Sequence, residues 1–313
     1  MLTTISQEIK RHLQSFSRND VLLFNNEQLA IEKGNFHSLH ARTESPRIAF
    51  VDGGQAEIIS TGNFCLSLIR VFGQVFQGKT KIQPYKKEMY LFSKAVWNEG
   101  DIFYKSTIFS AGEPLLTEGD LFLSSQDTSL KIGKERAPIT RITAMARRLA
   151  ELRLASMIDA DFVVLDGTLE PAFTNEEKYL SALPDTVSAL AKTSTLLTLS
   201  GNSPVILLQA LGPAGCWSYF VNNKTYFTKL QERAKHVFRF EGNKEVLPYL
   251  LEQSQDALFL GYPYGLILAD QMARVSNMEK KSLRMSFLLK AENKEIVEYL
   301  NAGNAHEILD SLG

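Results

Sequence analysis

The chain has few of the residues that build zinc sites and disulfide frameworks. Its 313 residues include two cysteines, Cys65 and Cys216, and five histidines, with no CxxC pair and no Cys/His cluster. Zinc sites of the usual kinds need such clusters, so none is expected. Both cysteines lie in apolar surroundings and are expected to be buried free thiols. A reducing compartment is the default for such a chain, and we expect a cytoplasmic protein.

Long apolar runs and a strong net charge are also missing. No stretch approaches the roughly 18 apolar residues of a membrane-spanning helix. The first residues, MLTTISQEIKRHLQSF, have an amphipathic pattern and lack the apolar centre of a signal peptide. We therefore expect no membrane partner. Because the net charge is −1, any binding of nucleic acid must use a local basic patch.

Motifs for nucleotide binding and for Ser-His-Asp hydrolysis are absent as well. The sequence contains no P-loop, and no GxGxxG follows a strand pattern. His37, His40, His236 and His306 stand outside any such motif and are expected on the surface or in the N-terminal arm. The chemistry of the protein must therefore come from other side chains.

What the sequence does contain is the pattern of a mixed α/β protein. Residues 47–52, RIAFVD, and 161–166, DFVVLD, each predict a buried strand that ends at glycine. Residues 138–158 predict a helix, because apolar side chains recur there at steps of three and four. The aromatic segment 88–110 predicts antiparallel strands. The expected fold is α/β, with one central mixed sheet and flanking helices.

Other segments complete this prediction. Residues 174–200 predict one or two helices, residues 204–212 a strand, and residues 266–277 a helix. Residues 1–45 are polar and mixed, and are expected to form a helix followed by an irregular arm. No linker interrupts the remaining sequence, so residues 46–313 are expected to form a single domain.

Asp52 and Asp166 are the first candidates for a functional site. Each ends a buried strand and precedes a glycine, and Asp-Gly is also a common turn pair, so either residue alone is explained as a turn former. Two such strands can, however, deliver both carboxylates to one edge of a sheet. Like charges brought close together repel unless a cation lies between them. The pair therefore predicts a metal site.

Glu151 and Asp270 are further candidates. Glu151 lies on the predicted helix before the second strand, where spacing alone favours an ion pair with Arg147 or Arg148 over a role in the site. Asp270 lies in an apolar helix start, and it either caps the helix, pairs with Arg274 or binds a metal. Several carboxylates at one place suit Mg²⁺ or Mn²⁺. Two such ions can activate water for phosphodiester hydrolysis.

Basic and aromatic side chains are candidates for contact with nucleic acid. Lys192 and Thr193, in ALAKTST, predict a phosphate contact, although a solvated helix lysine explains Lys192 equally well. Tyr262, in GYPYG, either stacks on a base or packs on the core. Arg148 belongs to a dense group of arginines on or beside the Glu151 helix. The group comprises Arg136, Arg141, Arg147, Arg148 and Arg153.

Four short motifs follow one another along the chain: VDGG (51–54), VLDGT (164–168), AKTS (191–194) and GYPYGLILAD (261–270). The helix bearing Glu151 lies between the first two. Over roughly residues 45–277, this order and spacing resemble the NurA nuclease family. The order of the motifs is more specific than either Asp-Gly strand alone.

The resemblance implies an RNase H-like core with additional strands and helices around it. It implies a Mn²⁺-dependent deoxyribonuclease, with Mg²⁺ as a possible substitute, that acts 5′→3′ on DNA ends and endonucleolytically on single strands. It further implies a homodimer that works with a hexameric HerA-type translocase in the resection of double-strand breaks, a step of homologous recombination.

Carried over residue by residue, the resemblance makes Asp52, Glu151 and Asp166 catalytic metal ligands and matches Lys192 to the family's lysine. Two positions differ from the family's pattern. Asp270 stands where the family often has histidine, and the first motif is VDGG, with Gly54, where VDGS is usual. These departures motivate an alternative, a catalytically weak or inactive scaffold that docks on a translocase and DNA. An RNA-cleaving RNase H-like enzyme is a third interpretation.

Overall fold

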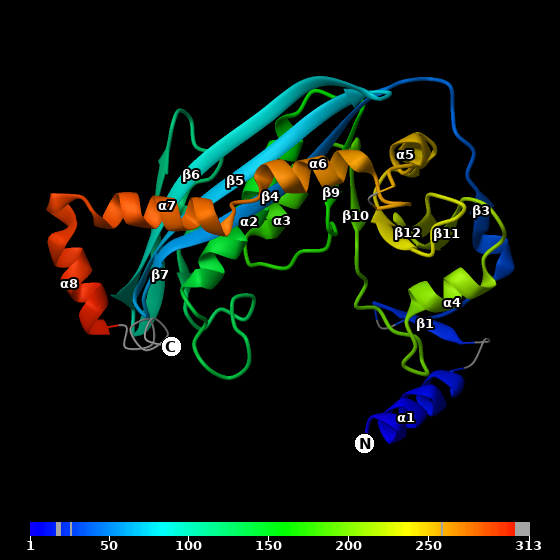
Figure 1. Ribbon diagram of the computed structural model, residues 1–313, viewed down its shortest axis with the longest axis horizontal. Helices are drawn as coiled ribbons and strands as arrows, with labels where there is room; N and C mark the ends of the chain where they lie inside the picture. The colour runs from blue at the N-terminus through cyan, green and yellow to red at the C-terminus, as the bar shows by residue number, and fades with distance from the viewer. Residues whose placement is uncertain (17–19, 26, 258, 304–313) are drawn as a thin grey trace.

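The computed structural model describes residues 1–16, 20–25, 27–257 and 259–303 (Figure 1). A short hairpin joins β1 (Val21–Phe24) to β2 (Glu27–Ala30). The other strands form one mixed sheet in the order β3-β11-β12-β13-β10-β9-β4-β5-β6-β7-β8. They are β3 (Phe36–Ser38), β4 (Arg47–Ser60), β5 (Phe64–Gln77), β6 (Thr80–Asn98), β7 (Asp101–Ser110), β8 (Leu123–Ser124), β9 (Phe162–Asp166), β10 (Val187–Ala191), β11 (Trp217–Asn222), β12 (Thr225–Lys229) and β13 (Phe238–Glu241).

Helices pack on both faces of this sheet, whereas the first helix lies apart from it and has no buried residue (Figure 1). They are α1 (Leu2–Gln14), α2 (Thr140–Met157), α3 (Glu176–Leu180), α4 (Pro204–Leu211), α5 (Leu247–Gln253), α6 (Tyr264–Ala273), α7 (Asn277–Leu288) and α8 (Lys294–Gly303). The central strand β4 separates α2 from α6. Its residues Ala49 and Val51 belong to the core that includes α2, whereas Ile48 and Phe50 belong to the core that includes α6. Alternate residues of β4 therefore face different helices.

The middle of the sheet has the strand order of an RNase H-like core. Strands β4, β5 and β6 are antiparallel neighbours, and β9 joins β4 on its other side in parallel. Strand β10 continues in parallel with β9, and α2 leads directly into β9. The structure thus confirms the α/β fold with an RNase H-like core. Strands β7 and β8 extend one edge, and β13, β12, β11 and β3 extend the other.

Several local predictions are wrong. Residues 204–211 form helix α4 instead of a strand, and Pro204 occupies its first turn, where the missing N–H costs nothing. Residues 174–200, predicted as one or two helices, contain only the short helix α3 and then strand β10. This strand consists mainly of small apolar residues and is buried along its whole length. The expected irregular arm contains the β1–β2 hairpin and β3, which pairs with β11.

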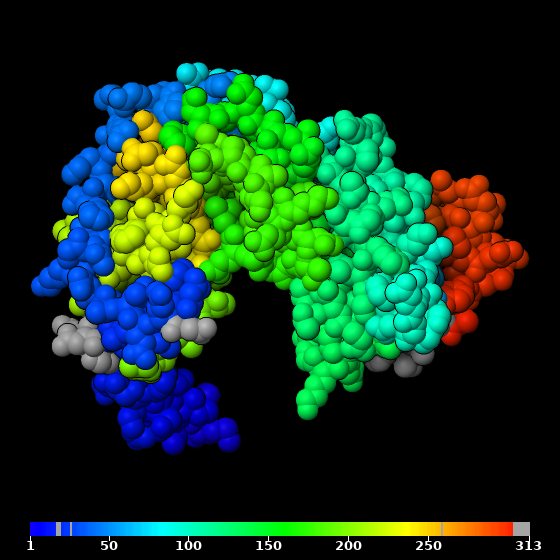
Figure 2. All heavy atoms as spheres, turned by 180° about the vertical axis from the view of Figure 1, so that it is seen from behind, coloured from blue at the N-terminus to red at the C-terminus, as the bar shows by residue number. Residues whose placement is uncertain are grey.

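The molecule has the shape of an arch. Figure 2 shows a hollow between two lobes, one formed by N-terminal residues and the other by the region around β6 and β7. Strands β9 and β10 run towards this hollow in Figure 1. No helix in the described part of the chain is both long and apolar enough to cross a membrane.

Candidate active site

The two Asp-Gly strands lie side by side. Strands β4 and β9 are parallel neighbours whose last registered pair is Val51 with Leu165, so Asp52 and Asp166 come next on each strand. Both side chains fall on the α6 face of the sheet, because side chains alternate along a strand and Val51 and Leu165 pack on the α2 side. The structure therefore brings these two carboxylates to one place, where β9 ends.

Glu151 approaches the same place from the opposite face. It is only 2% exposed on α2, and it lies against Gly53. A Cβ atom added to Gly53 would be 2.9 Å from Glu151 Cγ and 3.0 Å from its Cδ. Glycine at position 53 thus gives Glu151 the space to lie beside Asp52. Glu151 also forms an ion pair with Arg147, and Arg148 Nη1 lies 4.0 Å from its Oε2.

Lys192 and Tyr262 both contact Asp166. Lys192, directly after β10, forms an ion pair with Asp166 Oδ2 at 2.5 Å. Tyr262 donates its hydroxyl proton to Asp166 Oδ1 at 3.1 Å, and the Lys192 ammonium lies 5.2 Å from the centre of the Tyr262 ring. Contacts to both carboxylate oxygens of Asp166 therefore fix the orientation of its side chain.

Asp270 lies on α6 at the margin of this group. Its carboxylate pairs with Arg274 one helical turn later, at 2.5 Å, and its side chain is 34% exposed. Its negative charge contributes to raising the pKa of both Lys192 and Tyr262. Asp270 therefore lies within electrostatic range of the Asp166 cluster, with an arginine as its direct partner.

Burial and the neighbouring charges shift the pKa values of the ionisable groups in the site. Burial, together with the charges of Asp166 and Glu151, raises the pKa of Asp52 to about 8, against the opposing effect of the Gly53 N–H and Lys192. Burial also raises the pKa of Glu151, although Arg147 and Arg148 oppose this. Burial alone would lower the pKa of Lys192, but Asp166, Asp52 and Asp270 raise it. Burial and mutual repulsion thus disfavour the charged forms of Asp52 and Glu151, while the neighbouring basic side chains oppose this.

This donor set has the chemistry of a site for a hard divalent cation. Carboxylate oxygens are the preferred ligands of Mg²⁺ and Mn²⁺, and a bound cation would offset the repulsion that Asp166 and Glu151 exert on Asp52. Across the described residues, however, no three acidic, His or Cys side chains lie close enough together, as they stand, to hold a metal ion. In the structure, Glu151 lies on the α2 face of the sheet. Asp166 and Asp270 each form an ion pair with a basic side chain instead.

Two predicted DNA-binding side chains make other contacts. Tyr262 is 1% exposed, so its ring is covered and only its hydroxyl serves the site. Arg148 is 9% exposed and binds Glu176 and the carbonyl of Thr168. Thr193, next to Lys192, is exposed as a phosphate contact would require.

A buried network that the sequence did not indicate supports the segment after Asp166. Glu241 on β13 accepts a hydrogen bond from Leu169 N at 2.6 Å and pairs with Arg239. Arg239 also pairs with Glu170 in the same segment. The network holds residues 168–170 against β13. These partners are about 70 residues apart in sequence, so no local pattern could have revealed them.

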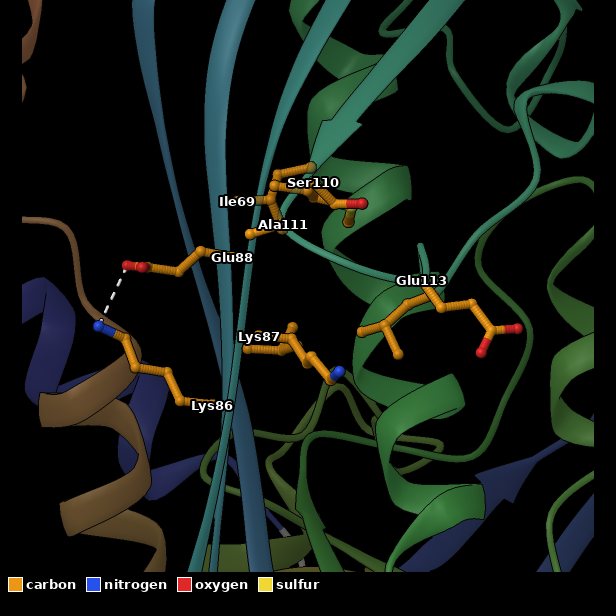
Figure 3. A pocket seen from close by; sticks show the side chains of 10 residues that line it. Ile69, Lys86, Lys87, Glu88, Ser110, Ala111 and Glu113 are labelled. Carbon is orange, nitrogen blue, oxygen red and sulfur yellow. Dashed lines mark ion pairs between the residues drawn. The ribbon is translucent and has the colours of Figure 1, made fainter.

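The cavity shown in Figure 3 is separate from this site. It has a volume of about 240 Å³ and is lined by β5, β6 and the segment after β7. Its lining includes no acid of the Asp52 cluster. It does include Glu88, which pairs with Lys86.

The fold and the site together define the class of protein. An RNase H-like core with carboxylates brought together where its first and fourth core strands adjoin suits a nuclease. The sequence model of the NurA domain matches residues 46–206, more than half of the chain. The chain belongs to the NurA family.

Solved structures are similar at low sequence identity. A crystal structure of NurA has a TM-score of 0.48 and 8% identity, and the match covers 84% of this chain and 92% of that one. Human ENDOV has a TM-score of 0.39 and 11% identity over 87% of this chain and 96% of that one. The catalytic domain of human Endonuclease V has a TM-score of 0.37 and 11% identity, over 92% and 99%. No curated protein sequence matches the chain.

Proposed function

We propose that the chain is a metal-dependent deoxyribonuclease that hydrolyses phosphodiester bonds at the junction of β4 and β9. The observation that carries this proposal is the convergence of Asp52 and Asp166 on adjacent parallel strands, with Glu151 buried against Gly53. Burial and this convergence together raise the pKa of Asp52, and the repulsion between the acids costs free energy unless a cation offsets it. Asp52 and Glu151 are buried and Asp166 is partly buried, and Asp52 has no basic side chain as an ion-pair partner among the described residues.

Mn²⁺, or Mg²⁺ in its place, would be held by Asp52 and Asp166, with Glu151 and Asp270 as the remaining acids. When bound, such ions supply water activation and charge neutralisation for phosphodiester cleavage. Lys192 would release Asp166 to the metal and turn its ammonium to the scissile phosphate, helped by the exposed Thr193. Tyr262 would keep Asp166 in its orientation through the hydroxyl hydrogen bond.

The hollow of the arch suits a polynucleotide. Strands β9 and β10 run towards it (Figure 1), and Asp166 is the last residue of β9 while Lys192 follows β10 directly. Its two lobes would flank a single strand or a duplex end. On the family resemblance, the action is 5′→3′ exonucleolytic on ends and endonucleolytic on single strands, in resection of double-strand breaks with a HerA-type hexameric translocase.

A homodimer is part of the same proposal. Trp97 is 70% exposed near the tip of the β6–β7 hairpin, as an interface residue would be, whereas Tyr104 on β7 is 5% exposed and belongs to the core. Leu2, Ile5 and Ile9 of α1 are also exposed apolar side chains. Sedimentation of the intact chain, with and without Trp97→Ser, would test whether the hairpin tip contributes to a dimer.

The function is tested by cleavage of a labelled single strand in Mn²⁺ by the wild type and by Asp52→Asn. We expect the substitution to lower the rate more than about 100-fold, because even loss of the outer partners of metal ligands costs about 10–100-fold. Undiminished cleavage by the variant would refute the site. Cleavage of a matched RNA strand in the same assay separates the deoxyribonuclease from an RNA-cleaving enzyme.

The second candidate function is a scaffold that binds DNA and a translocase without cleaving. It is favoured by the pairing of Glu151, Asp166 and Asp270 with Arg147, Lys192 and Arg274, because cations of the chain then stand where metal would neutralise charge. Calorimetric titration with Mn²⁺ separates the two functions. A nuclease binds the ion with loss of binding in Asp52→Asn, whereas a scaffold shows no specific binding.

A further inference from the structure

Helix α6 packs unusually close to β4 at both of its ends. Near its start, a Cβ atom on Gly265 would lie 2.5 Å from Phe50 Cε2. At its end, a Cβ atom on Gly54 would lie 2.8 Å from the carbonyl carbon of Ala273 and 3.1 Å from Arg274 Cα. Between the two contacts, Ala269 is fully buried. Small residues on both elements thus let the helix backbone lie directly on the strand.

The contact at Gly54 is with backbone atoms, which cannot rotate away as a side chain can. A larger residue at position 54 would therefore displace the last turn of α6 from β4. Arg70 holds the same turn from the neighbouring strand. It lies opposite Gly54 in the β4–β5 register and donates to the carbonyl of Arg274 at 3.0 Å. The end of α6 is thus fixed from both strands.

Arg70 is itself held by two acids. It pairs with Glu279 on α7 and with Glu88, the next residue in the cross-strand row, each at 2.5 Å. Figure 3 shows Glu88 turned towards Lys86, its second basic partner. Arg70 is 8% exposed, whereas the side chains of Glu88 and Glu279 reach the surface. These contacts tie the junction of α6 and α7 to the sheet.

We infer that Gly54 is a positioning residue: by seating the last turn of α6 on β4, it sets the reach of Asp270 towards Asp52 and Asp166. Asp270 lies one turn before Arg274, on the same last turns that Gly54 and Arg70 fix. Its side chain is short, so its carboxylate reaches the site only if the backbone is close. The inference rests on the proposed metal-dependent function and concerns the fourth acid of that site.

The seating of α6 also links two features of the sequence that looked independent. Gly54 lies on β4 and Asp270 on α6, more than two hundred residues later in the chain. In the structure, Gly54 permits the close approach of α6 to β4. Asp270 has a short side chain, which needs this close approach to reach the site. A helix displaced by a side chain at position 54 would need a longer residue at position 270 to reach the same place.

The test is a double-mutant cycle of Gly54→Ala and Asp270→Glu, read by Mn²⁺ calorimetry as well as by cleavage. We expect Gly54→Ala and Asp270→Glu each to weaken Mn²⁺ binding about 10-fold or more. The double variant should recover most of the lost affinity, since the longer acid compensates for the displaced helix. A merely structural role of Gly54 predicts no such rescue. Gly62→Ala is the matched control, because nothing lies within 4 Å of its Cβ position.

Wild-type affinity and cleavage in Gly54→Ala would overturn the inference while leaving the proposed nuclease intact. Additive losses in the double variant would overturn it as well. A wild type that neither binds Mn²⁺ nor cleaves would refute the proposed function itself. If circular dichroism shows Gly54→Ala unfolded, Arg70→Gln replaces it in the cycle, since this change loosens the same turn without adding an atom beside it. Failure of Asp270→Glu to rescue Arg70→Gln would then overturn the inference.

Discussion

The carboxylate of Glu151 lies against the backbone of Gly53, on the opposite face of β4 from Asp52. The strand between them carries no side chain at that point, so the two acids interact through the gap that glycine leaves. This relationship explains why Glu151 raises the pKa of Asp52 although the two residues belong to different layers. It also gives Gly53 a direct part in the packing of Glu151 against β4.

Gly53→Ala should therefore displace Glu151. The new Cβ would lie 2.9 Å from Glu151 Cγ, and this flexible side chain can turn away, so the fold should persist. We expect Mn²⁺-dependent cleavage to fall about 10–100-fold, as for other changes around metal ligands. Gly119→Ala, where the added atom meets nothing within 4 Å, is the control. Equal rates in the two variants would show that Glu151 does not act at the site.

The metal-free protein should lose stability as the pH rises. Asp52 has a pKa of about 8 when folded and about 3.9 when unfolded, so the folded state binds the proton more tightly. Its contribution to the free energy of unfolding is then largest below about pH 4 and is lost progressively up to about pH 8. Urea unfolding in chelator should show this slope in the wild type. Asp52→Asn should have a flatter profile of unfolding free energy against pH. The same slope in the variant and in the wild type would contradict the raised pKa of Asp52.

Mn²⁺ should reverse that loss. An ion that binds only the folded state stabilises it by about 2.7 kcal/mol at a concentration 100 times its dissociation constant. We expect this gain at pH 8 in the wild type, measured as a shift of the urea midpoint. Asp166→Asn should abolish most of it. A gain of the same size in that variant would mean that the ion binds elsewhere.

Tyr262→Phe separates two roles of the tyrosine. Its ring is 1% exposed and should pack unchanged, so the variant loses only the hydrogen bond to Asp166. We expect slower cleavage together with a stability change of about 1 kcal/mol. If the ring instead stacks on a base during catalysis, phenylalanine should retain full activity. Cleavage rate and thermal unfolding of the one variant decide between these outcomes.

Arg148→Met should lower the stability of the protein more than it lowers the affinity for DNA. Arg148 pairs with buried Glu176 and binds the carbonyl of Thr168, and breaking such a buried pair costs about 3–5 kcal/mol. Lys192→Met, at an exposed position, should reduce DNA affinity and its salt dependence with little loss of stability. If Arg148→Met instead lowers DNA affinity with little loss of stability, and Lys192→Met lowers stability, then Arg148 is a direct DNA contact.

The sequence was informative where structure is local. Apolar runs before Asp-Gly predicted β9 and the first part of β4, and the NurA resemblance predicted their order. The predicted end of the first strand at glycine is wrong, because β4 continues through Gly53 and Gly54 to Ser60 in register with β5. The ion pair of Glu151 with Arg147 was one of two interpretations from spacing, and the structure shows the pair and the burial together. Helix α4 was mistaken for a strand because an all-apolar run has no period, and only Pro204 signalled a helix start.

Long-range packing could not be predicted in the same way. The placement of Glu151 and Asp166 on different faces of the sheet depends on the β4–β9 register and on which face each helix covers. The seating of α6 on Gly54 joins segments more than two hundred residues apart. These contacts follow from tertiary packing, which the motif order does not encode.

The most direct test of the metal site is a crystal structure of the protein grown with Mn²⁺ and measured at the manganese absorption edge. The account predicts an anomalous peak between the carboxylates of Asp52 and Asp166, with Lys192 no longer paired with Asp166. A manganese-saturated crystal without such a peak, with Lys192 still bound to Asp166, would contradict the account.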